Sequence, residues 1–68
     1  MANVETVMRR VLAEFEEMPG MALTRRQAAR LFGLEHDLCR IVIDVLLDSA
    51  YLRETSTGII MLGDRVPA

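Results

Sequence analysis

The sequence predicts a small α+β domain, mainly α, with three helices followed by a β-hairpin. Apolar residues recur at helical spacing in three separate stretches, and two runs rich in β-branched and aromatic residues flank a Ser-Thr-Gly turn near the carboxyl end. A chain of 68 residues has room for one hydrophobic core, so residues 1–68 are expected to form a single domain. The 51% hydrophobic content is typical of a globular chain rather than a disordered one.

The first predicted helix covers residues 4–17. Asn3 suits the N-cap position, where a short polar side chain accepts a hydrogen bond from a free backbone N–H. The helix is expected to end before Pro19-Gly20, because Pro disfavours helical backbone in the residue that precedes it. The expected buried stripe comprises Val4, Val7, Met8, Val11, Leu12 and Phe15.

A short extended connector, residues 21–23, leads to the second predicted helix, residues 24–32. Thr24 and Gln27 have the spacing of a capping box, in which each side chain bonds the other residue's backbone N–H. Gly33 is expected to stop this helix in a left-handed conformation, which glycine adopts at little cost. The residues expected to be buried are Ala28, Leu31 and Phe32.

The third helix is predicted over residues 35–50, a stretch without Gly or Pro. Residues 51–62 are expected to form a hairpin, with strands at 51–55 and 59–62 and a positive φ at Gly58. Residues 63–68 are interpreted as a loose tail.

This order of elements resembles the winged helix-turn-helix superfamily. The stretch that carries the resemblance, residues 24–62, reads TRRQAARLFGLEHDLCRIVIDVLLDSAYLRETSTGIIML. The chain is also similar to short bacterial helix-turn-helix proteins that carry an EMPG-like segment before the motif, here residues 17–20. The resemblance implies a three-helix winged helix-turn-helix fold with a C-terminal β-hairpin wing. The matching positions are Ala29 at the helix crossing, Gly33 and Leu34 at the turn, and Cys39, Val42, Ile43 and Leu46 on the inward face.

In DNA-binding relatives, the second helix of the motif enters the major groove and its early residues meet base edges. The resemblance therefore implies a DNA-binding module acting on double-stranded DNA, in the role of a small transcriptional regulator that works as a dimer. The implied base contacts are Glu35, His36, Asp37, Arg40, Ile41 and Asp44. The implied phosphate contacts are Arg25, Arg26, Arg30 and Arg53.

The distribution of charge favours a different function. Residues 21–34 contain three Arg and no acid, but residues 35–54 contain five acids against Arg40 and Arg53, so the expected reading helix is net negative. Leu38, Ile41 and Val45 form a second apolar stripe on that helix, which favours a protein contact such as a two-fold homodimer. The alternative is therefore a winged-helix protein-interaction or oligomerisation module that does not bind DNA. A third alternative is a scaffold domain without a dedicated binding surface.

Nothing in the sequence indicates an enzyme. The chain has one Cys and one His, which exclude an internal disulfide and are too few for a typical protein metal site, so no metal, cofactor or small-molecule substrate is expected. Cys39 is interpreted as a small core residue. No apolar run is long enough to cross a membrane, and the first residues lack the pattern of a signal peptide, so a cytoplasmic location is expected.

Overall fold

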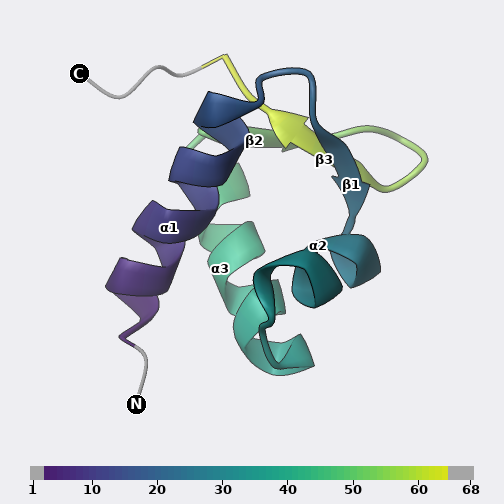
Figure 1. Cartoon of the computed structure of the whole chain (residues 1–68). Coiled ribbons are helices and arrows are strands. Elements are labelled where there is room, and N and C mark those ends of the chain that lie inside the picture. Colours follow the sequence, from purple (N-terminus) through teal and green to yellow (C-terminus); the bar gives the residue numbers. More distant parts are fainter. Residues whose placement is uncertain (1–2, 65–68) are drawn as a thin grey trace.

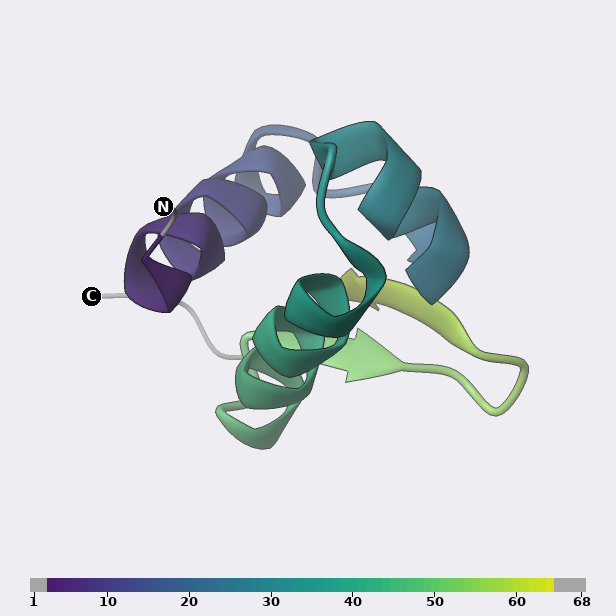
Figure 2. The same cartoon turned by 90° about the horizontal axis from the view of Figure 1, so that it is seen from below.

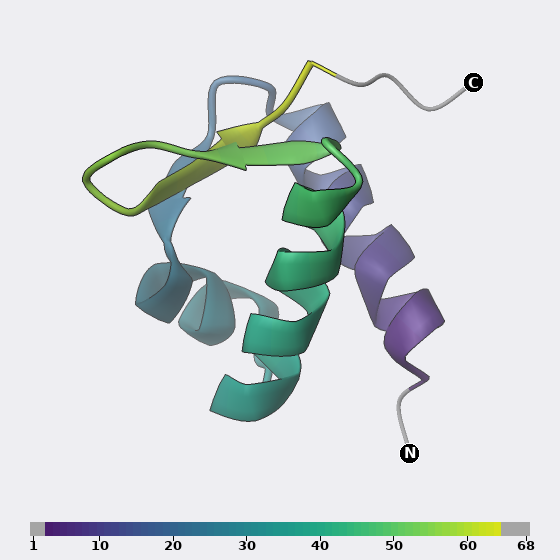
Figure 3. The same cartoon turned by 180° about the vertical axis from the view of Figure 1, so that it is seen from behind.

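The computed structural model describes residues 3–64, which form three helices and one three-stranded antiparallel sheet. The three helices lie on one side of the sheet (Figures 1 and 3). The prediction of a mainly helical α+β chain is confirmed. In chain order the elements are α1 (Val4–Glu17), β1 (Ala22–Thr24), α2 (Arg25–Phe32), α3 (His36–Asp48), β2 (Leu52–Glu54) and β3 (Ile59–Leu62).

Helix α1 has the predicted bounds and the predicted cap. The side-chain oxygen of Asn3 accepts a hydrogen bond from the backbone N–H of Glu5 at 2.8 Å, which satisfies one of the free donors of the first turn. Val7, Val11 and Phe15 are buried, but Val4 is 38% exposed. The apolar stripe of α1 is therefore wider than the surface that the core covers.

Helix α2 begins with the predicted capping box. The backbone N–H of Gln27 donates to the Thr24 hydroxyl at 3.1 Å, and the backbone N–H of Thr24 donates to the Gln27 side chain at 2.9 Å. Ala28 and Phe32 are buried as predicted, and Ala29 is half-buried against the core. The prediction for Leu31 was wrong, because its side chain is 58% exposed. Helix α2 has eight residues, which make about two turns, and the neighbouring elements leave the side that carries Leu31 largely uncovered.

Helices α2 and α3 end with the same pattern of backbone hydrogen bonds. The N–H of Leu34 donates to the carbonyl of Ala29 at 2.9 Å, and the N–H of Tyr51 donates to the carbonyl of Leu46 at 3.0 Å. These are the six-residue closures of Schellman motifs, which need one left-handed residue at the helix end. In α2 that residue is Gly33, with φ +65°, as predicted. In α3 it is Ala50, also with φ +65°, so an L-residue occupies a conformation that favours glycine. The third helix thus stops at Asp48, two residues before its predicted end.

The sheet contains a strand that the sequence interpretation left out. Residues 22–24 form β1 and pair antiparallel with β3, opposite residues 59–61, whereas the sequence predicts a connector at 21–23 and the start of the second helix at Thr24. The predicted hairpin of β2 and β3 is present, with Leu52 opposite Leu62 and the positive φ at Gly58. Because β3 is the central strand, the sheet ties the segment between α1 and α2 to the carboxyl end of the described chain.

The interpretation of residues 63–68 as a loose tail was wrong at Gly63. Its N–H donates to the carbonyl of Tyr51 at 2.8 Å, and a Cβ at this position would lie 2.5 Å from the carbonyl oxygen of Ala50. Gly63 is therefore packed against the backbone that follows α3. Residues 65–68 lie outside the described residues.

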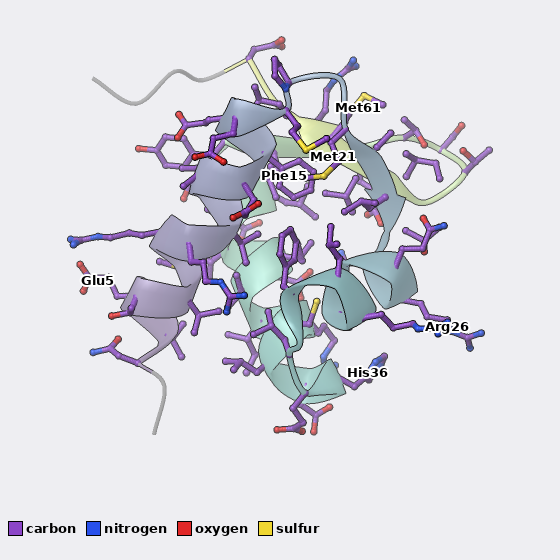
Figure 4. All side chains as sticks on the ribbon, viewed as in Figure 1. Glu5, Phe15, Met21, Arg26, His36 and Met61 are labelled. Atoms are coloured by element: carbon purple, nitrogen blue, oxygen red, sulfur yellow. The ribbon has the colours of Figure 1, made fainter. Side chains whose placement is uncertain are left out.

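The core lies between the helices and the inner face of the sheet. Phe15 of α1 and Phe32 of α2 are in tilted ring contact, with centroids 6.1 Å apart, and Figure 4 shows Phe15 pointing into this interior. Helix α3 packs against both α1 and α2 and lies between them when the molecule is seen from below (Figure 2). From α3 and the sheet the core receives Cys39, Val42, Ile43, Leu46, Leu52 and Ile60.

Candidate functional site

The exposed face of α3 carries all the predicted base-contact residues of that helix. His36, Asp37, Arg40, Ile41 and Asp44 are each exposed. Asp48, one turn after Asp44, is exposed as well, so three carboxylates lie at helical spacings that keep them on one side of α3. This face is net negative.

Arg25, predicted to contact phosphate, is bound by two carboxylates. Its Nη1 lies 2.9 Å from Oδ1 of Asp44 on α3, and its Nε lies 3.3 Å from Oε2 of Glu54 on β2. The guanidinium therefore joins the start of α2, the middle of α3 and the first strand of the hairpin. The two carboxylates together outweigh its charge, and the cluster of Arg25, Asp44 and Glu54 has a formal charge of −1. Nothing in the spacing along the sequence indicated this contact, because Glu54 is 29 residues from Arg25.

The pKa of Arg25 reflects this environment. Partial burial on its own lowers the pKa, but the hydrogen bonds to Glu54 and Asp44 and the charges of these two carboxylates outweigh burial, so the pKa lies above its ordinary value. Arg25 is thus a permanently charged group held in place by two acids.

A group of basic side chains lies along the edge where α2 and α3 meet. Arg26, Arg30, His36 and Arg40 are exposed, and none of the ion pairs found within residues 3–64 involves them. Arg26 and His36 project from this edge on the side away from Glu5 of α1 (Figure 4). A small hollow of about 60 Å³ lies here, lined by Arg25, His36, Cys39 and Arg40. We call Arg26, Arg30, His36 and Arg40 the basic edge.

Arg53 does not join the basic edge. Side chains alternate between the two faces of a strand, and Glu54, the next residue, reaches toward the helices to bind Arg25. Arg53 therefore lies on the outer face of the sheet, opposite Met61 in the register, and Figure 4 shows Met61 on the side away from the helices. A phosphate contact shared by α3 and Arg53 does not fit this placement.

The predicted apolar stripe of α3 is divided between two environments. Leu38 is half-buried and packs against the core, but Ile41 and Val45 are 46% and 38% exposed. Val45 lines a groove of about 760 Å³ between α1 and α3, which the sequence interpretation missed. The spacing along the sequence does not reveal this groove, because its apolar α1 residues, Val4, Met8 and Leu12, belong to the stripe of α1 that is predicted to be buried. The apolar lining residues are Val4, Met8, Leu12, Val45, Leu46 and Tyr51, and the polar ones are Asn3, Glu5 and Arg9.

The two helices that form the groove are acidic. Helices α1 and α3 together carry seven carboxylates and three arginines, a formal charge of −4, although the whole chain has a net charge of only −2. Within the groove wall, Nη2 of Arg9 and Oε1 of Glu5 are 2.7 Å apart and neutralise each other. The remainder of the chain is therefore net positive, and the charge is divided between the groove helices and the rest of the molecule.

Cys39 is buried and belongs to the core, as predicted. Burial raises the pKa of its thiol, and the positive charge of Arg25 offsets this only in part. Its Sγ lies 3.8 Å from the backbone carbonyl oxygen of Arg25, to which the thiol donates. Across residues 3–64, no three His, Cys, Asp or Glu side chains gather as a metal site would require. None of the described helices combines the length and apolar character needed to span a bilayer.

Comparisons with protein-family models, with curated proteins and with solved structures found no match to this chain.

Proposed function

We propose that this chain is a winged helix-turn-helix module that binds another protein through α1 and α3 and does not read DNA. The fold assignment is supported by the order of elements, by the left-handed Gly33 between α2 and α3, and by the antiparallel pair of β2 and β3 that follows. The function rests on one observation, which is the charge of the α3 face.

A helix that enters the major groove approaches a dense array of phosphates, and its outward face must tolerate that field. In this chain the outward face presents Asp37, Asp44 and Asp48, and the nearest predicted phosphate anchor, Arg25, is already bound to Asp44 and Glu54. An exposed acidic helix beside an apolar groove is instead typical of a surface that meets a protein partner.

One observation favours DNA binding as a second candidate. The basic edge contains three arginines and His36 without an ion-pair partner in the described part of the chain, with Arg26 in the first turn of α2, Arg30 in its last turn and His36 at the start of α3. Such a group can hold phosphates while α3 stays outside the groove. This candidate would use α2 more than α3.

A salt series with duplex DNA separates the two candidates. Binding of a labelled mixed-sequence duplex is followed by fluorescence anisotropy between 50 and 200 mM salt. We expect no more than weak association, with a slope of log K against log salt near zero for the wild type. Phosphate anchoring would give a slope that shrinks by about one unit when Arg26 or Arg40 is replaced by Ala. Arg10→Ala, an exposed arginine of α1, is the matched control.

A pull-down from an extract of the source cells tests the protein contact. Bound proteins are compared between the wild type, Val45→Asp in the groove, and Ala13→Asp on the exposed side of α1. We expect partners that the wild type and Ala13→Asp retain and Val45→Asp loses. The steep, arginine-dependent salt slope described above would overturn the proposed function, and so would identical proteins on all three baits.

A further inference from the structure

The groove between α1 and α3 has a mainly apolar floor. Val4 and Val45 both line it and are each 38% exposed, and Met8 and Leu12, which also line it, are half-buried and pack against the core. Ile41 extends the apolar surface by one turn along α3. Exposed apolar side chains that gather in one place on a small chain mark a surface that a partner covers.

The charges beside this floor define the partner's chemistry. Asp48 follows Val45 by three residues and Asp37 precedes Ile41 by four, so both lie next to the apolar strip on α3. Neither takes part in the ion pairs found within residues 3–64. On the α1 side, the Glu5–Arg9 pair adds no net charge. A partner that buries the floor must therefore bring cations to the α3 side.

A second copy of this chain does not satisfy that requirement. If two grooves met around a two-fold axis, the helices on each side would bring a formal charge of −4 against another −4. Within residues 3–64, the unpaired basic side chains of α2 and α3 form the basic edge, whose exposed apolar neighbour on α2 is the single side chain of Leu31. That face offers too little apolar surface to fill the groove.

We propose that the groove between α1 and α3 binds a cationic amphipathic helix of another protein, with the apolar side of that helix on Val4, Met8, Leu12 and Val45 and its Lys or Arg side chains against Asp37 and Asp48. The inference rests on the proposed function, because it names the kind of partner that the interaction surface takes. Recognition of an amphipathic helix in a groove is a common mode of peptide binding. Charge on one side of the groove fixes which way the helix lies.

The probe is a synthetic 14-residue helical peptide of Leu and Lys, with Leu on one face. Its counterpart carries Glu in place of Lys. Binding to the full chain is measured by fluorescence anisotropy of the labelled peptide. We expect saturable binding of the Lys peptide and at least tenfold weaker binding of the Glu peptide. Replacing Asp37 and Asp48 by Asn together should weaken the Lys peptide severalfold, and the effect should shrink as salt is added.

Val45→Asp distinguishes the groove from general charge attraction. This variant adds a negative charge, so attraction by bulk charge would strengthen binding of the Lys peptide, whereas loss of apolar contact in the groove should weaken it at least tenfold. Ala13→Asp adds the same charge on the exposed side of α1 and should leave binding nearly unchanged. Val4→Asp is the second groove variant, and it is expected to fold because an acidic residue in the first turn of a helix is favourable.

The outcomes separate this inference from the proposed function. No saturable binding of the Lys peptide, equal binding of the two peptides, or undiminished binding to Val45→Asp and Val4→Asp would overturn the cationic helix, and the proposed function would then stand on the DNA series. Self-association of the wild type in light scattering that Val45→Asp abolishes would also overturn it, in favour of a second copy. Steep arginine-dependent binding of DNA would overturn the proposed function itself.

Discussion

Replacing Ala50 by glycine is expected to stabilise this protein, although the change adds no contact. Ala50 is exposed and has φ +65°, a conformation that costs an L-residue roughly 1–2 kcal/mol. Glycine removes that cost, but its greater conformational freedom in the unfolded chain lowers the free energy of unfolding by roughly 0.5–1 kcal/mol. The expected net gain in the free energy of unfolding is therefore about 0.5–1 kcal/mol.

The opposite change at the end of α2 provides the matched comparison. Gly33 has the same φ of +65°, and a Cβ placed there would meet nothing within 4 Å. Gly33→Ala therefore introduces only the conformational cost, and we expect a loss of about 0.5–1 kcal/mol.

Urea unfolding followed by far-ultraviolet circular dichroism measures both variants, and thermal unfolding should show shifts of about 2–8 °C in opposite directions. A lower midpoint for Ala50→Gly, or shifts of the same sign in the two variants, would refute the reasoning.

Three further predictions concern packing, charge and pH. Gly63→Ala should destabilise the protein by about 1–3 kcal/mol in urea unfolding, because the added Cβ would lie 2.5 Å from the backbone oxygen of Ala50. Gly20→Ala is the control and should be close to neutral, since a Cβ there meets nothing within 4 Å. Equal effects of the two changes would contradict the close packing at Gly63. Double-mutant cycles of Arg25→Met with Asp44→Asn and with Glu54→Gln should each give a coupling free energy of about 0.2–1 kcal/mol, since all three side chains are partly exposed. This coupling should fall as salt is added. Zero coupling at low salt would show that the cluster does not link α2, α3 and β2. The thiol of Cys39 should react with a thiol reagent far more slowly in the folded than in the unfolded chain, because burial raises its pKa. Because the pKa is raised in the folded state, the contribution of the thiol to stability is complete below the pKa of the unfolded thiol and is lost as pH rises through the pKa of the folded thiol. Cys39→Ala should therefore make the free energy of unfolding less dependent on pH at alkaline pH. An unchanged pH dependence would count against this assignment.

The sequence predicted the parts of the fold that local chemistry determines. Asn3 and the Thr24–Gln27 pair satisfy free N–H groups within a few residues of themselves, and Gly33 and Gly58 supply the backbone freedom that their turns need. These features can be recognised from spacing alone.

The missed features depend on residues far apart in the chain. Residues 22–24 are too few to show a period of two, and they become a strand only because residues 59–61 arrive beside them. Leu31 has a helical spacing that predicts burial, but no neighbour covers it. In the candidate site, the contact of Arg25 with Glu54 and the division of the apolar stripe around Val45 likewise required the packed arrangement of the helices.

The position of β3 has a consequence for synthesis on the ribosome. The two neighbours of β3 are made earlier, and until residues 59–62 have left the exit tunnel neither β1 nor β2 has a partner for its backbone groups. We therefore expect nascent chains stalled before residue 59 to remain sensitive to protease, and protection to appear in one step once Leu62 has emerged.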